Sequence, residues 1–213
     1  MILKHRAYKY LRKYQMIYSK SQNPTELYFG YGANLNPKRF KKLRMNYTDL
    51  GVANLKDHEI NFTLATEYKH KSYAGVHGLE GSVVPGYLVK LDKKSLKYLD
   101  CLEWCGFGAY KRVKKKVVFE NDLIEAWVYI VNKPDEDRYP SKIYLNNMIK
   151  AAEDNNFSKE YIDKLKLQKC KESFEIDPLF SLRTYSRSRI NIQLLIPIYR
   201  IHDKLREYLC SII

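Results

Sequence analysis

Residues 29–35 of the chain read Phe-Gly-Tyr-Gly-Ala-Asn-Leu, and the rest of the sequence is interpreted from this stretch. Apolar and aromatic residues over 26–31 predict a short buried strand that runs directly into a glycine turn. Because glycine has no side chain, the backbone N–H groups of such a turn can approach a ligand closely and bind an anion. An ordinary strand-to-helix turn has the same pattern, so the stretch alone does not define a site.

Two carboxylates, Asp100 and Glu103, stand three residues apart near the end of a predicted helix over 93–104. Gly106 and Gly108 follow and favour the end of that helix. The dipole of a helix disfavours a negative charge at its C-terminus, which favours a role in proton transfer if the carboxylate faces an apolar environment. A solvated surface acid is the alternative.

A third feature is the run Pro140-Ser141-Lys142-Ile143-Tyr144. Ser141 is a good N-cap for a helix over 142–154, and a further helix is expected from Ser158 to about Cys170. Helix capping with a packed tyrosine would give the same pattern.

The middle of the chain has the composition of strands, rich in Val, Ile, Tyr and Phe and interrupted by Gly, Asp and Asn. Asn121-Asp122 is the expected hairpin turn, and Asn36 and Pro37 favour the start of a helix that continues to about Leu43. Helices on both sides of these strands, without βαβ alternation, predict an α+β fold with a largely antiparallel, closed sheet. The strands are expected at 50–56, 58–66, 82–91, 112–119 and 123–131.

The ordered set of these motifs resembles the γ-glutamylcyclotransferase family over about residues 27–166. The stretch YFGYGANL is similar to the family's YxYGSNL loop, and the strand VPGYLVKLD at 84–92 is similar to its V-x-G-x-x-[YW]-x-[LM] strand. Leu99–Glu103 is similar to the family's LDxxE, and Tyr110-Lys111-Arg112 to its Y-x-[RV]. The resemblance implies a small, mostly antiparallel, closed or barrel-like sheet flanked by helices. Helices at the N- and C-terminal ends would be additions to it.

The activity implied by the resemblance is an intramolecular attack, in which the α-amine of a γ-glutamyl group attacks its own γ-carbonyl. The products are 5-oxoproline and a free amine or amino acid. Because the nucleophile is tethered to the carbonyl, much of the entropy cost is already met. The resemblance assigns proton transfer to Glu103 and substrate binding to two sets of residues. These are the loop residues Tyr31, Gly32, Ala33, Asn34 and Leu35, through their backbone N–H groups, and the cavity residues Tyr110, Tyr129 and Tyr144.

One position departs from the family loop, because Ala33 stands where the family has serine. If that serine contributes only its backbone N–H group, the change is harmless, whereas a lost hydroxyl bond to substrate would cost about 1 kcal/mol or more. The YGxNL form is closer to the branch that acts on γ-glutamyl amino acids than to the glutathione-specific or γ-glutamylamine branches. The fold alone does not determine the substrate.

The formal net charge of +14 is concentrated at the two ends of the chain. Residues 1–24 contain six Lys or Arg and no acid, and residues 2–19 have the apolar spacing of an amphipathic helix. A second amphipathic pattern lies within 190–212. We therefore divide the chain into an N-terminal helix at 1–24, a γ-glutamylcyclotransferase-like domain at 25–170 and a C-terminal extension at 171–213.

The basic N- and C-terminal segments also fit functions other than that of an enzyme. Their apolar stripes are expected to pack against the core or against each other, as in a homodimer. Their charge also fits a nucleic acid or an anionic membrane surface, with an affinity that falls steeply with salt. A protein that holds a small acidic ligand or nucleotide without turnover is a further alternative, since Ala33 departs from the family loop.

The cysteines and the hydropathy pattern complete the sequence predictions. Cys101, Cys105, Cys170 and Cys210 form no CxxC pair and have no histidine at ligand spacing, so a zinc site has no support in the sequence. The family resemblance implies neither a metal nor an organic cofactor. Reduced thiols and the lack of an apolar leader or membrane span predict a cytoplasmic protein.

Overall fold

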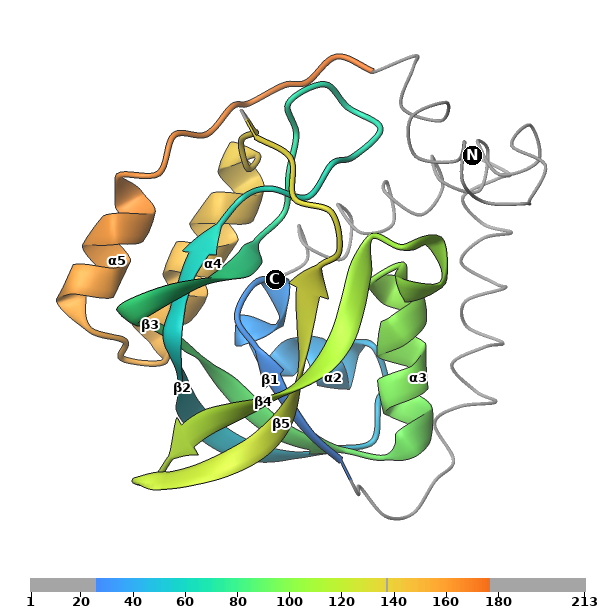
Figure 1. The fold of residues 1–213 in the computed structure, drawn as a ribbon, viewed down its shortest axis with the longest axis vertical. Coiled ribbons are helices and arrows are strands. Elements are labelled where there is room, and N and C mark those ends of the chain that lie inside the picture. The colour runs from blue at the N-terminus through green and yellow to red at the C-terminus, as the bar shows by residue number, and fades with distance from the viewer. Residues whose placement is uncertain (1–25, 137, 177–213) are drawn as a thin grey trace.

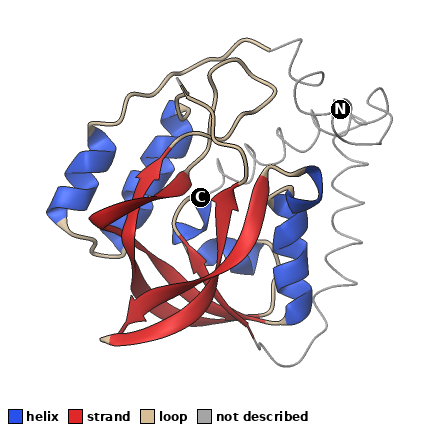
Figure 2. Cartoon of the chain, viewed as in Figure 1, coloured by secondary structure: helices blue, strands red, loops and turns tan. Residues whose placement is uncertain are grey.

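The computed structural model describes residues 26–136 and 138–176. A five-stranded sheet lies at its centre, with α3 on one side and the adjacent helices α4 and α5 on the other (Figure 1). Figure 2 shows the same division between central strands and flanking helices. The strands are β1 (Glu26–Gly30), β2 (Tyr47–Asn61), β3 (Gly75–Leu91), β4 (Tyr110–Phe119) and β5 (Asp122–Val131).

The strands are ordered β1-β3-β2-β4-β5, and the sheet closes on itself. All neighbouring pairs are antiparallel except β1 with β5, which pair in parallel at Tyr28 and Trp127. The predicted α+β class, with a mostly antiparallel, closed sheet between helices, is confirmed. The closure brings β1 between β3 and β5, so the loop that follows β1 lies among residues from distant parts of the sequence.

The long strand β2 differs from the prediction of two strands at 50–56 and 58–66. The break expected near Asp57 is a bulge, where Asp57 has a φ of 55° and its carboxylate accepts the N–H of Gly81 at 3.0 Å. The strand continues through this bulge to Asn61, and residues 62–66 leave the sheet. A polar residue inside a strand was therefore misread as a turn.

The hairpin between β4 and β5 is shifted by one residue from the prediction. Phe119 pairs with Asp122, so the two turn residues are Glu120 and Asn121. Both have positive φ values, of 48° and 75°, as a two-residue hairpin turn requires. Asp122 already belongs to β5.

Side-chain caps begin the three longer helices. Asp92 caps α3 (Lys93–Leu102) by accepting the N–H of Ser95 at 2.6 Å. Ser141 and Ser158 cap the other two in the same way. These are α4 (Lys142–Asp154), which agrees with the predicted range, and α5 (Lys159–Lys166), which ends four residues before the predicted end.

The short helix α2 (Lys38–Lys42) begins after Pro37 rather than directly after Asn36. The side chain of Asn36 accepts the N–H of Lys38 at 3.0 Å, but the N-cap position is Pro37, so Asn36 is not the cap that the sequence predicts. The next turn carries the chain from α2 into β2, where the backbone N–H of Asn46 donates to Ser95 of α3. This contact ties the segment after α2 to the start of α3.

Residues 171–176 run back over the start of α4. Lys171 forms a bridge with Ser141, and Ile176 forms one with Tyr68. Residues 1–24 and 177–213 lie outside the described residues, and so do the amphipathic helices predicted for them. Among the residues that the structure describes, no helix combines the length and apolarity needed to cross a bilayer.

Candidate active site

The loop after β1 is built on two glycines that allow close approach. A side chain on Gly30 would place its Cβ 2.8 Å from the Cβ of Asn34, and one on Gly32 would lie 2.8 Å from the hydroxyl of Tyr144. A 3-10 turn at Ala33–Leu35 follows, in which the N–H of Leu35 donates to the carbonyl of Gly32 at 3.0 Å. The loop therefore folds back on itself directly against Tyr144.

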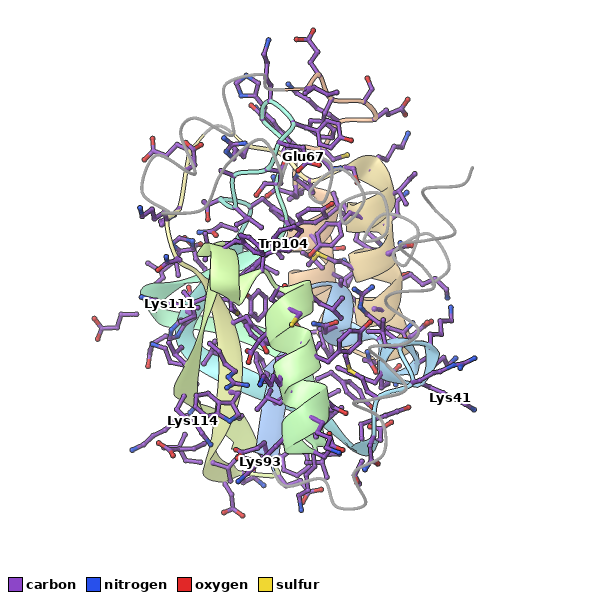
Figure 3. All side chains as sticks on the ribbon, turned by 90° about the vertical axis from the view of Figure 1, so that its right-hand side faces the viewer. Lys41, Glu67, Lys93, Trp104, Lys111 and Lys114 are labelled. Atoms are coloured by element: carbon purple, nitrogen blue, oxygen red, sulfur yellow. The ribbon has the colours of Figure 1, made fainter. Side chains whose placement is uncertain are left out.

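Glu103 lies at the C-terminal end of α3 and is buried, with 8% of its surface exposed. Its N–H donates to the carbonyl of Leu99 at 2.8 Å, so it closes the last helical turn. Trp104 follows in the left-handed conformation, with a φ of 52°. Figure 3 looks onto α3, with Lys93 at its start and Trp104 just beyond its end. This sharp change of direction separates Glu103 from β4.

The side chain of Asn34 connects the loop to the carboxylate. Its Nδ2 lies 3.3 Å from Oε1 of Glu103 and 2.8 Å from the hydroxyl of Tyr28. An ionised carboxylate only accepts hydrogen bonds, so this contact fixes which end of the Asn34 amide carries the N–H groups. Two features that are 69 residues apart in the sequence thus meet in one buried contact.

The other end of the Asn34 amide has a different environment. Its Oδ1 is buried and has no hydrogen-bond partner among the residues that the structure describes. Buried polar atoms are almost always bonded, so an exception points to a ligand or a functional role. The carboxylate of Glu103 and the oxygen of Asn34 are both acceptors, and this pair is suited to a ligand that carries N–H donors.

The backbone of Ala74 joins two of the predicted tyrosines. Tyr110 donates to the carbonyl of Ala74 at 2.7 Å, and the N–H of Ala74 donates to the hydroxyl of Tyr144 at 3.3 Å. Tyr31 donates to the backbone carbonyl of Tyr129. Buried tyrosine hydroxyls normally find such partners, and here they fix the rings around the loop.

Burial raises the pKa of Tyr31 well above its usual value, and nearby Tyr110, Tyr28, Glu103 and Tyr144 add to the effect in that order. The pKa of Tyr28 is also raised, first by burial and then by the negative charge of Glu103. Both phenols therefore stay protonated. The same interactions show that these side chains share one buried region.

Tyr129 differs from the other predicted residues in where its hydroxyl points. The ring is buried, but the hydroxyl lies 2.9 Å from Oδ1 of Asp100 and 3.3 Å from the carbonyl of Leu96, both on α3. The pKa of Tyr129 is raised by burial and then by the charge of Asp100. The side-chain hydroxyl of Tyr129 is thus bonded to α3, while its backbone carbonyl accepts a hydrogen bond from the hydroxyl of Tyr31.

Two members of this region were missed by sequence reasoning. Tyr28 could have been found, because strand alternation places it on the same face as Gly30 at the end of β1. Ala74 acts through its backbone, and no sequence pattern marks it. No group of three or more His, Cys, Asp or Glu side chains that could hold a metal ion occurs in the described part of the chain.

Solved structures similar to this chain define the class of fold. A structure titled gamma-glutamyl cyclotransferase is 25% identical, covers 76% of this chain and 98% of its own length, and has a TM-score of 0.63. YkqA from Bacillus subtilis is 27% identical, over 72% of this chain and 56% of its own length, with a TM-score of 0.59. An uncharacterised human protein at 24% identity, with a TM-score of 0.63, shows the same fold. The chain therefore has the γ-glutamylcyclotransferase-like fold.

Sequence comparisons agree with the structural ones. Residues 83–165 match the model of the AIG2-like family. Human gamma-glutamylcyclotransferase is 29% identical over 145 residues, which are 66% of this chain and 77% of the human protein. The resemblance that the motifs indicate is thus confirmed.

Proposed function

We propose that the chain is an enzyme of the γ-glutamylcyclotransferase type, which releases 5-oxoproline and a free amine or amino acid from a γ-glutamyl compound. The observation that supports this most strongly is the buried contact between Asn34 and Glu103 at 3.3 Å. It joins the glycine loop to a carboxylate in a region whose other polar members are tyrosines.

The substrate's α-carboxylate would bind the loop after β1. Leu35 uses its N–H group within the loop, so the amides of Gly32 and Ala33 are the ones we assign to the carboxylate. Consecutive backbone N–H groups at a glycine turn form an anion-binding concavity. The contact between Gly32 and Tyr144 places a tyrosine hydroxyl beside the same position.

The substrate's α-ammonium would lie between two acceptors, the carboxylate of Glu103 and the buried Oδ1 of Asn34. This arrangement satisfies the one polar atom of Asn34 that has no partner within the described residues. Nδ2 of Asn34 meanwhile holds the carboxylate in place. The two oxygens would orient the nitrogen toward the γ-carbonyl carbon of its own substrate.

Glu103 would then move the protons. It first takes a proton from the α-ammonium, which frees the nitrogen lone pair for attack on the γ-carbonyl carbon and gives a tetrahedral intermediate. It passes that proton to the leaving nitrogen as the original amide C–N bond breaks, and the second proton lost by the α-nitrogen leaves with the released amine, which departs as an ammonium. The reaction is a rearrangement of one substrate molecule and needs no water as reactant, because the nucleophile is tethered.

The classes of γ-glutamyl substrate differ in the amine that the reaction releases. The loop form YGANL is closest to the branch of the family that acts on γ-glutamyl amino acids, so γ-glutamyl-alanine is the first compound to test. Ala33 removes one hydroxyl from the loop but keeps its backbone N–H group, so carboxylate binding through the backbone does not depend on the missing serine.

The test measures release of 5-oxoproline from a panel of γ-glutamyl amino acids, γ-glutamyl amines and glutathione, by the full chain and by Glu103→Gln. We expect product from at least one class with the native chain and almost none with the variant. No product from any compound would overturn the proposed reaction. Equal rates for the two proteins would overturn the role of Glu103 alone.

A further inference from the structure

Asp100 has both of its carboxylate oxygens occupied. Oδ1 accepts from the hydroxyl of Tyr129 at 2.9 Å, and Oδ2 lies 3.2 Å from a guanidinium nitrogen of Arg112. The ion pair is half-buried, with 26% of the Asp100 side chain and 27% of the Arg112 side chain exposed. A carboxylate held on two sides by different residues has little freedom to rotate.

Its two partners are themselves fixed by the sheet. Arg112 of β4 and Tyr129 of β5 are directly paired across the antiparallel ladder. The guanidinium carbon of Arg112 lies 4.6 Å from the centre of the Trp127 ring, which holds it by a cation–π contact. The ring of Tyr129 packs edge-on against Tyr28 at 5.6 Å. Asp100 therefore joins α3 to two neighbouring strands rather than to one mobile surface residue.

This attachment lies one turn before Glu103 on the same helix. The residues after it turn sharply: Trp104 is left-handed, and the N–H groups of Phe107 and Ala109 both donate to its carbonyl. The N–H of Glu103 donates to the carbonyl of Leu99, so the backbone of Glu103 is attached to the last turn of α3. The position of Glu103 relative to Asn34 thus depends on how the last turn of α3 is held.

We propose that Asp100, Tyr129 and Arg112 form a clamp that positions Glu103, so that Tyr129 acts on the reaction through Asp100 and not by touching substrate. This inference rests on the proposed function for its kinetic consequence. The three are positioning residues: they set where the end of α3 lies, and Glu103 remains the group that carries the proton.

The kinetic test uses Tyr129→Phe, Asp100→Ala and the double variant of the full chain. Tyr129→Phe keeps the ring contact with Tyr28 and the carbonyl that receives Tyr31, and removes only the hydroxyl. Misplacement of a catalytic group by a fraction of an ångström to 1 Å costs up to about 100-fold, so we expect kcat to fall about tenfold for Tyr129→Phe and about 100-fold for Asp100→Ala. KM should stay nearly constant.

The double variant separates positioning from substrate contact. If Tyr129 acts through Asp100, the double variant is no slower than Asp100→Ala, because the same bond has already been lost. If its hydroxyl touches substrate, the two effects multiply and Tyr129→Phe raises KM. Asp154→Asn, which removes a carboxylate from the exposed pair with Lys150 on α4, is the matched control and should leave both constants unchanged.

Hydrogen exchange supplies a readout that does not need turnover. Loss of one hydrogen bond should speed exchange of the amides of Glu103, Phe107 and Ala109 by roughly three- to tenfold in Tyr129→Phe, with no change in α4. Faster exchange with reduced kcat supports the clamp. Three results would overturn the clamp: unchanged exchange rates, a raised KM with unchanged kcat, or losses in the double variant that equal the product of the two single losses. If the native chain releases no 5-oxoproline, the proposed function is wrong. The hydrogen-exchange rates then test by themselves whether Asp100 holds the helix turn that contains Glu103.

Discussion

The two carboxylates near the end of α3 lie in different surroundings although they are three residues apart. Glu103 is buried and contacts the amide of Asn34, which comes from the loop after β1. Asp100 is partly exposed and contacts Arg112 and Tyr129 from the neighbouring strands. The contact described for Glu103 is with an amide, and those described for Asp100 are with a guanidinium and a hydroxyl.

This difference indicates a division of labour. The ion pair with Arg112 ties the carboxylate of Asp100 to β4, which suits a structural contact. Glu103 contacts the neutral amide of Asn34 beside the loop after β1, which is where we propose that the substrate binds. Both positions carry a carboxylate near the end of the same helix, so the partners that distant segments supply distinguish the two proposed roles.

The largest effect should come from Glu103→Gln, which keeps the shape of the side chain but removes its ability to accept a proton. General acid–base groups contribute roughly 10²–10⁴-fold, so kcat should fall by about that factor. Steady-state release of 5-oxoproline measures it, and circular dichroism of the same sample confirms the fold. A loss of less than about tenfold would mean that the two carboxylates do not differ as described.

Asn34→Ala comes next, because it removes both the donor to Glu103 and the proposed acceptor for the ammonium. Loss of a hydrogen bond to a buried charged group costs about 1–3 kcal/mol, so kcat/KM should fall roughly 5- to 150-fold. Asn36→Ala, two residues along, removes only the contact with Lys38 at the start of α2 and is the matched control. Equal losses in the two variants would indicate general damage to the loop.

Asp100→Asn should have a smaller effect than Asp100→Ala. Asparagine keeps an acceptor for the hydroxyl of Tyr129 but loses the ion pair with Arg112, and a partly exposed pair is worth about 0–1 kcal/mol. We expect kcat to fall no more than about fivefold. Measured beside Glu103→Gln, this is the same acid-to-amide change on the other carboxylate. Similar losses at both positions would contradict their separate roles.

Ala33→Ser should have the smallest effect. Restoring the hydroxyl that the family loop carries should raise kcat/KM by up to about fivefold if it bonds substrate, equivalent to about 1 kcal/mol. No change means that this position contributes only its backbone N–H group. Isothermal titration with 5-oxoproline, alongside the kinetics, shows whether any gain lies in binding.

Local signals were enough to predict the elements that carry the site. The capping serine of α4, the glycines around residues 29–35 and the leucine spacing of α3 each depend on neighbouring residues, and the structure contains all three elements. The predicted break between two strands at Asp57 was wrong, because a β-bulge and a turn can both contain a polar residue such as aspartate. The energy that extends β2 beyond it comes from pairing with β3, which lies outside the local sequence.

The contacts that distinguish the carboxylates could not be predicted in this way. The direction of the Tyr129 hydroxyl depends on Arg112 pairing with Tyr129 and on α3 packing beside both strands. The link between Asn34 and Glu103 depends on β1 entering the sheet between β3 and β5. Both follow from strand order, which a single sequence does not specify, and the motifs indicated the site only through their family resemblance.

The most direct test of the central claim is a crystal structure of the full chain with 5-oxoproline bound. We predict that the carboxylate of the product lies on the amides of Gly32 and Ala33, with its ring nitrogen within hydrogen-bond distance of Glu103 and of Oδ1 of Asn34. Product bound away from the loop, or with Glu103 turned from the ring nitrogen, would contradict the account.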